Sequence, residues 1–340
     1  MKRIVVAALI CLLSFIGCYR NNKSFEDNYV IITIEEGLVD QLEYYVVGEQ
    51  IKKLGYKVKY DTTWYKRVGY SNAGLNSRFV LSKLKAFIYF WSDSIIDKKK
   101  SFNSRTLQLK QAFPYIDFIE AGDKEIKFYK KHFRFPKRKG YWQFGDNIKP
   151  PLYMPMHIDK WRFCKEVSSG MLRFNEHSIV QRECYEYFHF EDSILDDKNL
   201  EVLQRIRTEK CPVGVHVRRG DDAVRGVTSS AQYYVKAVNK VKELFPDASF
   251  FFISDEPDYV KNELLPMFDS KIKIEIIDIN DVNTSYKDFF LMSECKHQIR
   301  SFGSMGAIAY LINRYPGKKL ISPNVVRVYS NIKPDFVIEG

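Results

Sequence analysis

A chain of 340 residues with 45% hydrophobic and 15% aromatic residues can form one large domain or two domains with real cores, which excludes a disordered protein. The formal net charge of +11 indicates acidic partners such as nucleotides or anionic lipid head groups. Nucleic acid is disfavoured as a partner, because the sequence has no RNA-binding signature and much of the charge comes from scattered lysines.

The first 18 residues have the pattern of a targeting segment. Lys2 and Arg3 precede an apolar run over 4–16, and Gly17-Cys18 follows. The run is short for a spanning helix, which needs about 17–25 residues. The pattern therefore favours a bacterial lipoprotein signal with Cys18 as the lipidated N-terminus, or an uncleaved signal anchor. In both cases we expect a membrane-associated protein, attached through its N-terminus and followed by a polar tether over 19–28.

The segment after the tether opens with the strand–helix–strand order of a Rossmann-like unit. We expect a strand over 29–34, a helix over 39–54 and a strand over 57–60. Further along, helices are predicted at 78–96, at 124–132 and within 160–188, and the Pro-rich stretch 149–155 is predicted to be a loop.

The second half of the chain alternates strands and helices regularly, which predicts a parallel sheet with right-handed crossovers. A β-branched strand through Val213, Val215 and Val217 begins this order. The later strands are expected at 249–253, 271–277, 297–299 and 319–321, and the helices at 231–244, 286–295 and 305–313.

Polar residues stand where three of these strands end: Arg218 and Arg219, then Ser254 and Asp255, then Ser301, Phe302 and Gly303. In an open α/β sheet, ligands bind in the crevice beyond the carboxyl ends of the strands. Side chains alternate along a strand, so His216 and Arg218 should share one face and Arg219 should point to the other. Two guanidinium groups and the N-terminus of a following helix would bind a pyrophosphate without a metal.

Other interpretations of these residues stay open at this point. The two arginines could pair with Asp221 and Asp222 in a structural ion cluster. Asp255 could accept hydrogen bonds from a base or ribose, or it or Ser254 could cap a helix that has Pro257 in its first turn. Among the cysteines, Cys164 and Cys184 could form a disulfide in an exported protein, whereas Cys211 and Cys295 fit buried apolar positions.

Several motifs in a fixed order resemble the α-1,2-fucosyltransferases. They are His216-Val-Arg218-Arg219-Gly-Asp221, the aromatic strand that ends in Ser254-Asp255 and continues to Tyr259-Val-Lys261, Asp288-Phe-Phe-Leu291-Met292-Ser293-Glu-Cys295-Lys296-His297, and Gly140-Tyr-Trp-Gln143. The resemblance covers roughly 29–326 and is densest after Val213. One such motif is a weak signal, but several in order are a strong one.

This resemblance implies an α/β, GT-B-like fold with two Rossmann-like lobes whose parallel sheets face a cleft. Residues 29–205 would form the acceptor-side lobe and 206–340 the GDP-sugar lobe. It also implies inverting, metal-independent transfer of L-fucose from GDP-fucose to a sugar hydroxyl, commonly O2 of a galactoside, with no other cofactor. Arg218 and His216 would be catalytic, and the substrate would contact Arg219, Asp221, Ser254, Asp255, Ser301, Phe302, Gly303, Gly37 and Gln41.

The first loop departs from the family pattern Gly-Gly-x-Gly-Asn-Gln and is here Glu35-Glu36-Gly37-Leu38-Val39-Asp40-Gln41. Glu35, Glu36 and Asp40 are candidates for the catalytic base, because their loop should border the cleft, but they equally fit solvated loop charges. The altered loop and the export signal favour an alternative hypothesis: a non-catalytic surface lipoprotein that keeps the fold and binds glycan or nucleotide.

Overall fold

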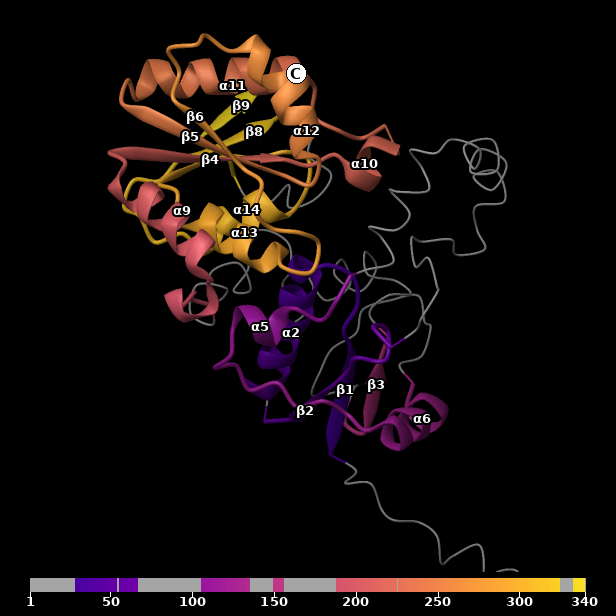
Figure 1. The fold of residues 1–340 in the computed structure, drawn as a ribbon. Coiled ribbons are helices and arrows are strands. Elements are labelled where there is room, and N and C mark those ends of the chain that lie inside the picture. The colour runs from indigo at the N-terminus through magenta and orange to yellow at the C-terminus, as the bar shows by residue number, and fades with distance from the viewer. Residues whose placement is uncertain are drawn as a thin grey trace, which may run out of the picture.

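The computed structural model describes residues 28–53, 55–66, 105–134, 149–155, 188–224, 226–324 and 333–339. Two parallel sheets with flanking helices form two lobes that follow each other along the chain (Figure 1). The expected α/β, GT-B-like architecture is thereby confirmed. The targeting segment, the helix expected at 78–96, Gly140–Gln143, and Cys164 and Cys184 lie outside the described residues. Within the described ranges, no helix is both long enough and apolar enough to cross a membrane.

The N-terminal lobe contains a three-stranded parallel sheet in the order β2-β1-β3. Its central strand is buried on both faces, as is usual in a parallel sheet, which explains the continuous apolar run Val30–Ile32. The elements are β1 (Tyr29–Thr33), α2 (Leu38–Lys53), β2 (Lys57–Asp61), α5 (Leu109–Ala112), α6 (Asp123–His132) and β3 (Leu152–Met154).

The prediction of a loop over 149–155 was wrong in its centre, because β3 pairs in parallel with β1. Pro150 and Pro151 precede the strand and Pro155 follows it, so the three residues between them keep the backbone groups that a ladder needs. The prolines therefore bound the strand and do not interrupt it.

The C-terminal lobe contains a six-stranded parallel sheet in the order β6-β5-β4-β7-β8-β9. Its strands are β4 (Cys211–Val217), β5 (Ala248–Ser254), β6 (Ile274–Ile277), β7 (His297–Ile299), β8 (Leu320–Pro323) and β9 (Phe336–Ile338). Its helices are α9 (Asp197–Thr208), α10 (Gly220–Val224), α11 (Ala231–Leu244), α12 (Pro257–Tyr259), α13 (Ser285–Ser293) and α14 (Met305–Ile312). Shorter helical turns are η2 (Asp192–Ile194), η3 (Val260–Leu264) and η4 (Leu265–Met267).

Most elements predicted for this lobe are confirmed, with α11 and β7 matching to the residue. Helix α11 starts where expected because Ser230 Oγ accepts a hydrogen bond from Tyr233 N at 3.1 Å. The strand expected at 271–277 begins only at Ile274, and β9 was not predicted. Strand β9 is a short edge strand whose central residue, Val337, is 56% exposed, so it lacks the apolar run that marks the inner strands.

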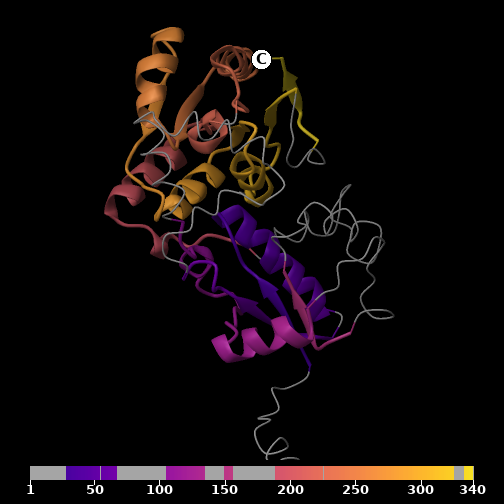
Figure 2. The ribbon, with the colours of Figure 1, turned by 90° about the vertical axis from the view of Figure 1, so that its right-hand side faces the viewer.

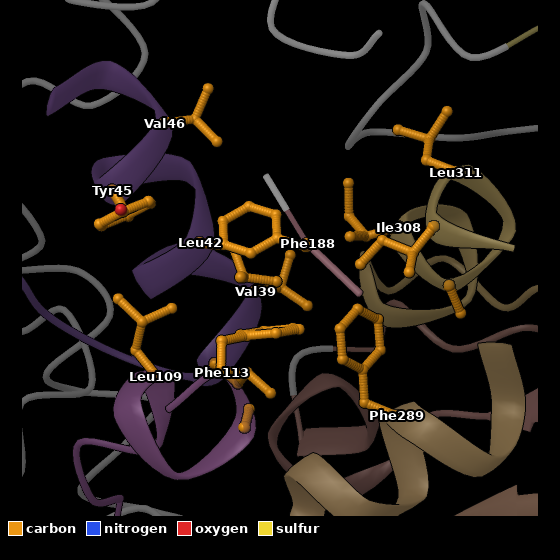
Figure 3. Close-up of a cluster of buried hydrophobic side chains, with 14 of the residues drawn as sticks. Val39, Leu42, Tyr45, Val46, Leu109, Phe113, Phe188, Phe289, Ile308 and Leu311 are labelled. Carbon is orange, nitrogen blue, oxygen red and sulfur yellow. The ribbon is translucent and has the colours of Figure 1, made fainter. Parts of the chain in front are cut away.

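One apolar core joins the two lobes. Val39 and Leu42 of α2 pack in the same buried cluster as Phe289 of α13 and Ile308 and Leu311 of α14 (Figure 3). Figure 2 shows the ribbon from the side, with the upper end of α2 below the gold helices of the C-terminal lobe. The lobes are therefore packed on each other and not merely tethered. Cys211 and Cys295 are buried free thiols, as expected.

Candidate functional site

The carboxyl end of β4 separates its charged side chains onto two faces of the sheet. A Cβ atom built on Gly303 would lie 3.3 Å from Arg218 Cγ and 3.3 Å from His216 Cε1, so these two side chains lie together. The Arg219 guanidinium instead lies 3.6 Å from the centre of the Tyr259 ring. The alternation expected from the strand is thus confirmed.

Arg218 is held by an acid from the neighbouring strand end. Its Nη1 atom forms an ion pair with Asp255 Oδ2, and the backbone N–H of Arg219 donates to Asp255 Oδ1 at 2.9 Å. Asp222 is more distant, with 3.8 Å between its Oδ2 and Arg218 Nε. The Arg218 side chain keeps 27% exposure, so it remains accessible to a ligand.

The structural ion cluster that the sequence left open is present for Arg218 and Asp222, and it also includes the two acids that follow β5. Arg219 Nε donates to Glu256 Oε2 at 3.1 Å, and the side chain of Asp221 lies outside the described residues. Both arginines thus form ion pairs with acids that directly follow β5. The prediction that Asp255 or Ser254 caps α12 was wrong, because Glu256 occupies the cap position.

Ser254 and Gly220 hold this cluster in shape. Ser254 Oγ donates to the carbonyl oxygen of Val217 at 2.8 Å and accepts from Glu256 N at 3.0 Å, so it fastens β5 to the end of β4. Gly220 has a φ of +27°, and a Cβ atom there would overlap Asp255 Oδ2. Only glycine leaves room for that carboxylate.

His216 is a buried, uncharged member of the site. Its Nδ1 atom lies 3.0 Å from Ser301 Oγ, and that hydroxyl accepts from Gly303 N at 3.2 Å. Burial first, and then the charges of Arg218 and Arg300, lower the pKa of His216 to about 3. His216 therefore stays neutral near pH 7 and can orient a hydrogen bond but not donate a surplus proton.

Arg300, which the sequence reasoning did not place in the site, shapes the loop after β7. Its side chain is 1% exposed, and it donates to the carbonyl oxygens of Ser301 at 3.2 Å and Gly303 at 3.5 Å. Burial lowers the pKa of Arg300 to about 10, so it remains a cation at neutral pH. Its position directly after a buried strand, like that of Arg218 after β4, was the signal that could have found it.

The loop ends at the N-terminus of α14, which begins at Met305 after Ser304. The first N–H groups of a helix and its dipole favour an anion. Arg218, His216, Ser301 and Gly303 are thus brought together at the carboxyl ends of the two central strands, β4 and β7, and Phe302 lies partly exposed between Ser301 and Gly303. This arrangement of cations and N–H groups suits a phosphate-bearing ligand.

Comparison with known proteins places this chain in a family. The model of glycosyl transferase family 11 matches residues 162–331, which is half of the chain. The chain belongs to glycosyl transferase family 11. The expected fucosyltransferase-type membership is thereby confirmed.

This family 11 chain is similar to one curated enzyme, the α-1,2-colitosyltransferase of Escherichia coli, with 29% identity over 144 residues. The alignment covers 39% of this chain and 46% of that enzyme, so the chain spans about half the length of the curated relative it matches.

Among solved structures, NodZ α-1,6-fucosyltransferase soaked with GDP-fucose is 14% identical, with a TM-score of 0.45 and coverage of 91% of this chain and 97% of that chain. Fucosyltransferase NodZ from Bradyrhizobium is 13% identical, with a TM-score of 0.43 and coverage of 84% and 92%. WaaG, a glycosyltransferase of lipopolysaccharide biosynthesis, is 10% identical, with a TM-score of 0.34 and coverage of 89% and 83%.

In the N-terminal lobe of this family 11 member, the loop after β1 is held from inside. Gln41 is fully buried, and its Nε2 donates to the carbonyl oxygen of Glu36 at 3.2 Å. The Tyr65 hydroxyl donates to the same carbonyl at 3.1 Å, and Gly37 O accepts from Gln41 N at 3.0 Å. Gln41 therefore acts in the framework of this loop.

The acids of this loop differ in exposure. Glu35 is only 7% exposed, so the interpretation of it as a solvated loop charge was wrong. Glu36 has a φ of 64°, a left-handed conformation that favours glycine, and its Oε2 lies 3.7 Å from Arg105 Nη1. Asp40 lies in the first turn of α2. Within the described ranges, no three His, Cys, Asp or Glu side chains gather as metal ligands.

Proposed function

We propose that this chain transfers L-fucose from GDP-fucose to a hydroxyl group of a sugar acceptor. The observation that carries the proposal is the partly exposed Arg218, which lies beside His216 and the loop before α14 at the carboxyl end of β4. Family membership supports a glycosyltransferase of the fucosyltransferase type. The E. coli relative is named for α-1,2 transfer of colitose, so a colitose donor belongs in the same assay.

The reaction separates charge at the donor diphosphate. The acceptor oxygen forms a bond to C1 of fucose while the bond from C1 to the phosphate oxygen breaks, which inverts the anomeric centre. The proton of the acceptor hydroxyl passes to a base, for which the acids of the loop after β1 are the candidates. The leaving GDP gains negative charge as its bond breaks. Arg218 would exchange Asp255 for the diphosphate and stabilise that charge, with the cation of Arg300 and the N–H groups of α14 behind it.

The acceptor and its linkage are part of the proposal. We expect transfer to O2 of a galactoside, because the sequence motifs resemble the α-1,2 enzymes. Metal independence is also expected, since guanidinium groups can take up the charge of the leaving group. Attachment to a membrane through residues 1–18 remains a prediction. The linkage is read from the product, and transfer in the presence of EDTA tests the role of metal.

The test compares the wild-type chain with Arg218→Ala and Arg218→Lys. We expect the wild type to release GDP from GDP-fucose with a lactose-type acceptor, and GDP to raise its melting temperature. Arg218→Ala should lower transfer by about 100-fold or more, since it removes a group that stabilises the leaving charge. Arg218→Lys should restore part of the rate. A wild-type chain that neither binds GDP nor turns over would refute the proposal.

A second candidate is a non-catalytic protein that keeps the fold and binds glycan or nucleotide. The buried Glu35 and the strained Glu36 favour it, because carboxylates stand where the family has small residues that admit a sugar nucleotide. Binding of a fucosylated glycan without any transfer would support this candidate, and measurable transfer would exclude it.

A further inference from the structure

Two buried glutamines connect the loop after β1 to the other lobe. Gln41, in the first turn of α2, donates from Nε2 to the carbonyl oxygens of Glu36 at 3.2 Å and Thr106 at 3.0 Å. Its Oε1 accepts from the backbone N–H groups of Gln108 and Leu109, both at 3.0 Å. All four hydrogen-bonding positions of this side-chain amide are used.

The side chain of Gln108, only 3% exposed, reaches from this segment to the start of α13. Its Oε1 accepts from Ser285 Oγ at 3.0 Å and from Tyr286 N at 3.1 Å, and its Nε2 donates to Val282 O at 2.6 Å. Thr284, at the cap position of α13, makes no side-chain cap bond. A residue 177 positions before Ser285 therefore supplies the cap of this helix.

We propose that Gln108 is a positioning residue that fixes the loop after β1 relative to the Arg218 site, and so aligns the acceptor with the donor. The proposal rests on the proposed function. The residues proposed to bind the sugar-nucleotide donor, His216, Arg218 and Gly303, all lie in the C-terminal lobe. The loop after β1, with Glu36 and Gly37, lies in the N-terminal lobe. Transfer requires that the bound acceptor and the bound donor are held in a fixed orientation, and small displacements of reacting groups have large effects on rate.

The directional nature of this contact distinguishes it from the apolar packing between the lobes. Apolar burial is non-directional and would tolerate small shifts of α2 against α13 and α14. Buried amide hydrogen bonds do not, because a displaced partner would leave a buried polar group unsatisfied. The pair Gln41 and Gln108 therefore sets the register of the two lobes, while the core supplies most of the adhesion.

The experiment uses the full-length chain and the variant Gln108→Ala, with Gln111→Ala as the matched control. Gln111 lies in α5, the short helix that Gln108 precedes as its cap residue, but the side chain of Gln111 is exposed. We expect kcat/KM for a lactose-type acceptor to fall by about tenfold or more in Gln108→Ala. The Kd for GDP should stay unchanged, because the donor residues are not touched. Ser285→Ala, which leaves the bonds to Tyr286 N and Val282 O, should show a smaller fall in the same parameter.

Wild-type kcat/KM in both Gln108→Ala and Ser285→Ala would overturn the proposal, and so would a loss of GDP affinity equal to the loss of transfer. Hydrogen exchange tests the bridge without enzyme activity: exchange at 36–41 and 284–287 should accelerate together in Gln108→Ala and not in Gln111→Ala. A wild-type chain that binds no GDP would overturn the proposed function and the transfer role with it. In that case faster exchange at both segments would still show the bridge itself.

Discussion

Asp255 holds Arg218 in a way that a diphosphate must reverse. The carboxylate bonds to the Arg218 guanidinium and to the backbone N–H of Arg219, so it preorganises the arginine and also competes with an anionic ligand. Partly exposed ion pairs of this kind contribute about 1 kcal/mol or less. GDP can therefore displace Asp255 from Arg218, and the free energy of this displacement is large enough to change the measured affinity for GDP.

We therefore expect Asp255→Asn to bind GDP more tightly, by up to roughly fivefold, because the ligand no longer displaces a charged partner. Asparagine can still accept from Arg219 N through Oδ1, which keeps the local backbone in place. Titration calorimetry with GDP measures the change. Weaker binding in Asp255→Asn would instead show that the carboxylate contacts the base or ribose.

At the scale of elements, the loop between β7 and α14 depends on close approach to β4. Gly303 leaves no spare volume beside Arg218 and His216, since a Cβ atom there would meet three of their carbon atoms at 3.3–3.4 Å. Its small size is therefore required by the contact with the catalytic candidates, and not by its own backbone conformation.

Gly303→Ala should consequently displace the Arg218 side chain and weaken GDP binding by about tenfold, and it should lower the melting temperature only slightly. The control is Gly122→Ala, because a Cβ atom at Gly122 would meet nothing within 4 Å. GDP affinity and melting temperature are measured for both variants. Equal affinities for Gly303→Ala and the wild type would refute the close contact.

The elements that the sequence predicts well are those whose signals are local. Strand β4 with Arg218 at its end, and α11 with its cap Ser230, need only neighbouring residues to be recognised. The partners of these elements are not local. Asp255 pairs with a residue 37 positions away, and Gln108 caps a helix 177 positions away, so no pattern within one segment could reveal either contact.

At the scale of the whole molecule, buried titratable groups link stability to pH. Burial lowers the pKa of His216 to about 3 and that of His297 to about 4, so below pH 6.5 the unfolded chain takes up protons that the folded chain refuses. These histidines make the protein less stable as pH falls. Glu43 and Asp288 act in the opposite direction, because burial raises their pKa values to about 8 and about 7.

The contribution of His216 is isolated by comparing the free energy of unfolding of the wild type with that of His216→Gln. Between pH 6 and pH 4, the free energy of unfolding of the wild type should fall relative to that of His216→Gln by about 1.4 kcal/mol per pH unit. Urea unfolding at a series of pH values gives both curves. His189→Gln, a change at an exposed histidine, should follow the wild type. Parallel curves for His216→Gln and the wild type would contradict the burial of a neutral imidazole.

The apolar core that joins the lobes bears on how this protein can be handled in the laboratory. The half that matches the family begins at residue 162 and omits α2, whose Val39 and Leu42 share a core with Phe289, Ile308 and Leu311. Expressed by itself, that half would expose Phe289, Ile308 and Leu311 to solvent, and we expect it to aggregate. Crystallisation and directed evolution should therefore start from a chain that retains both halves.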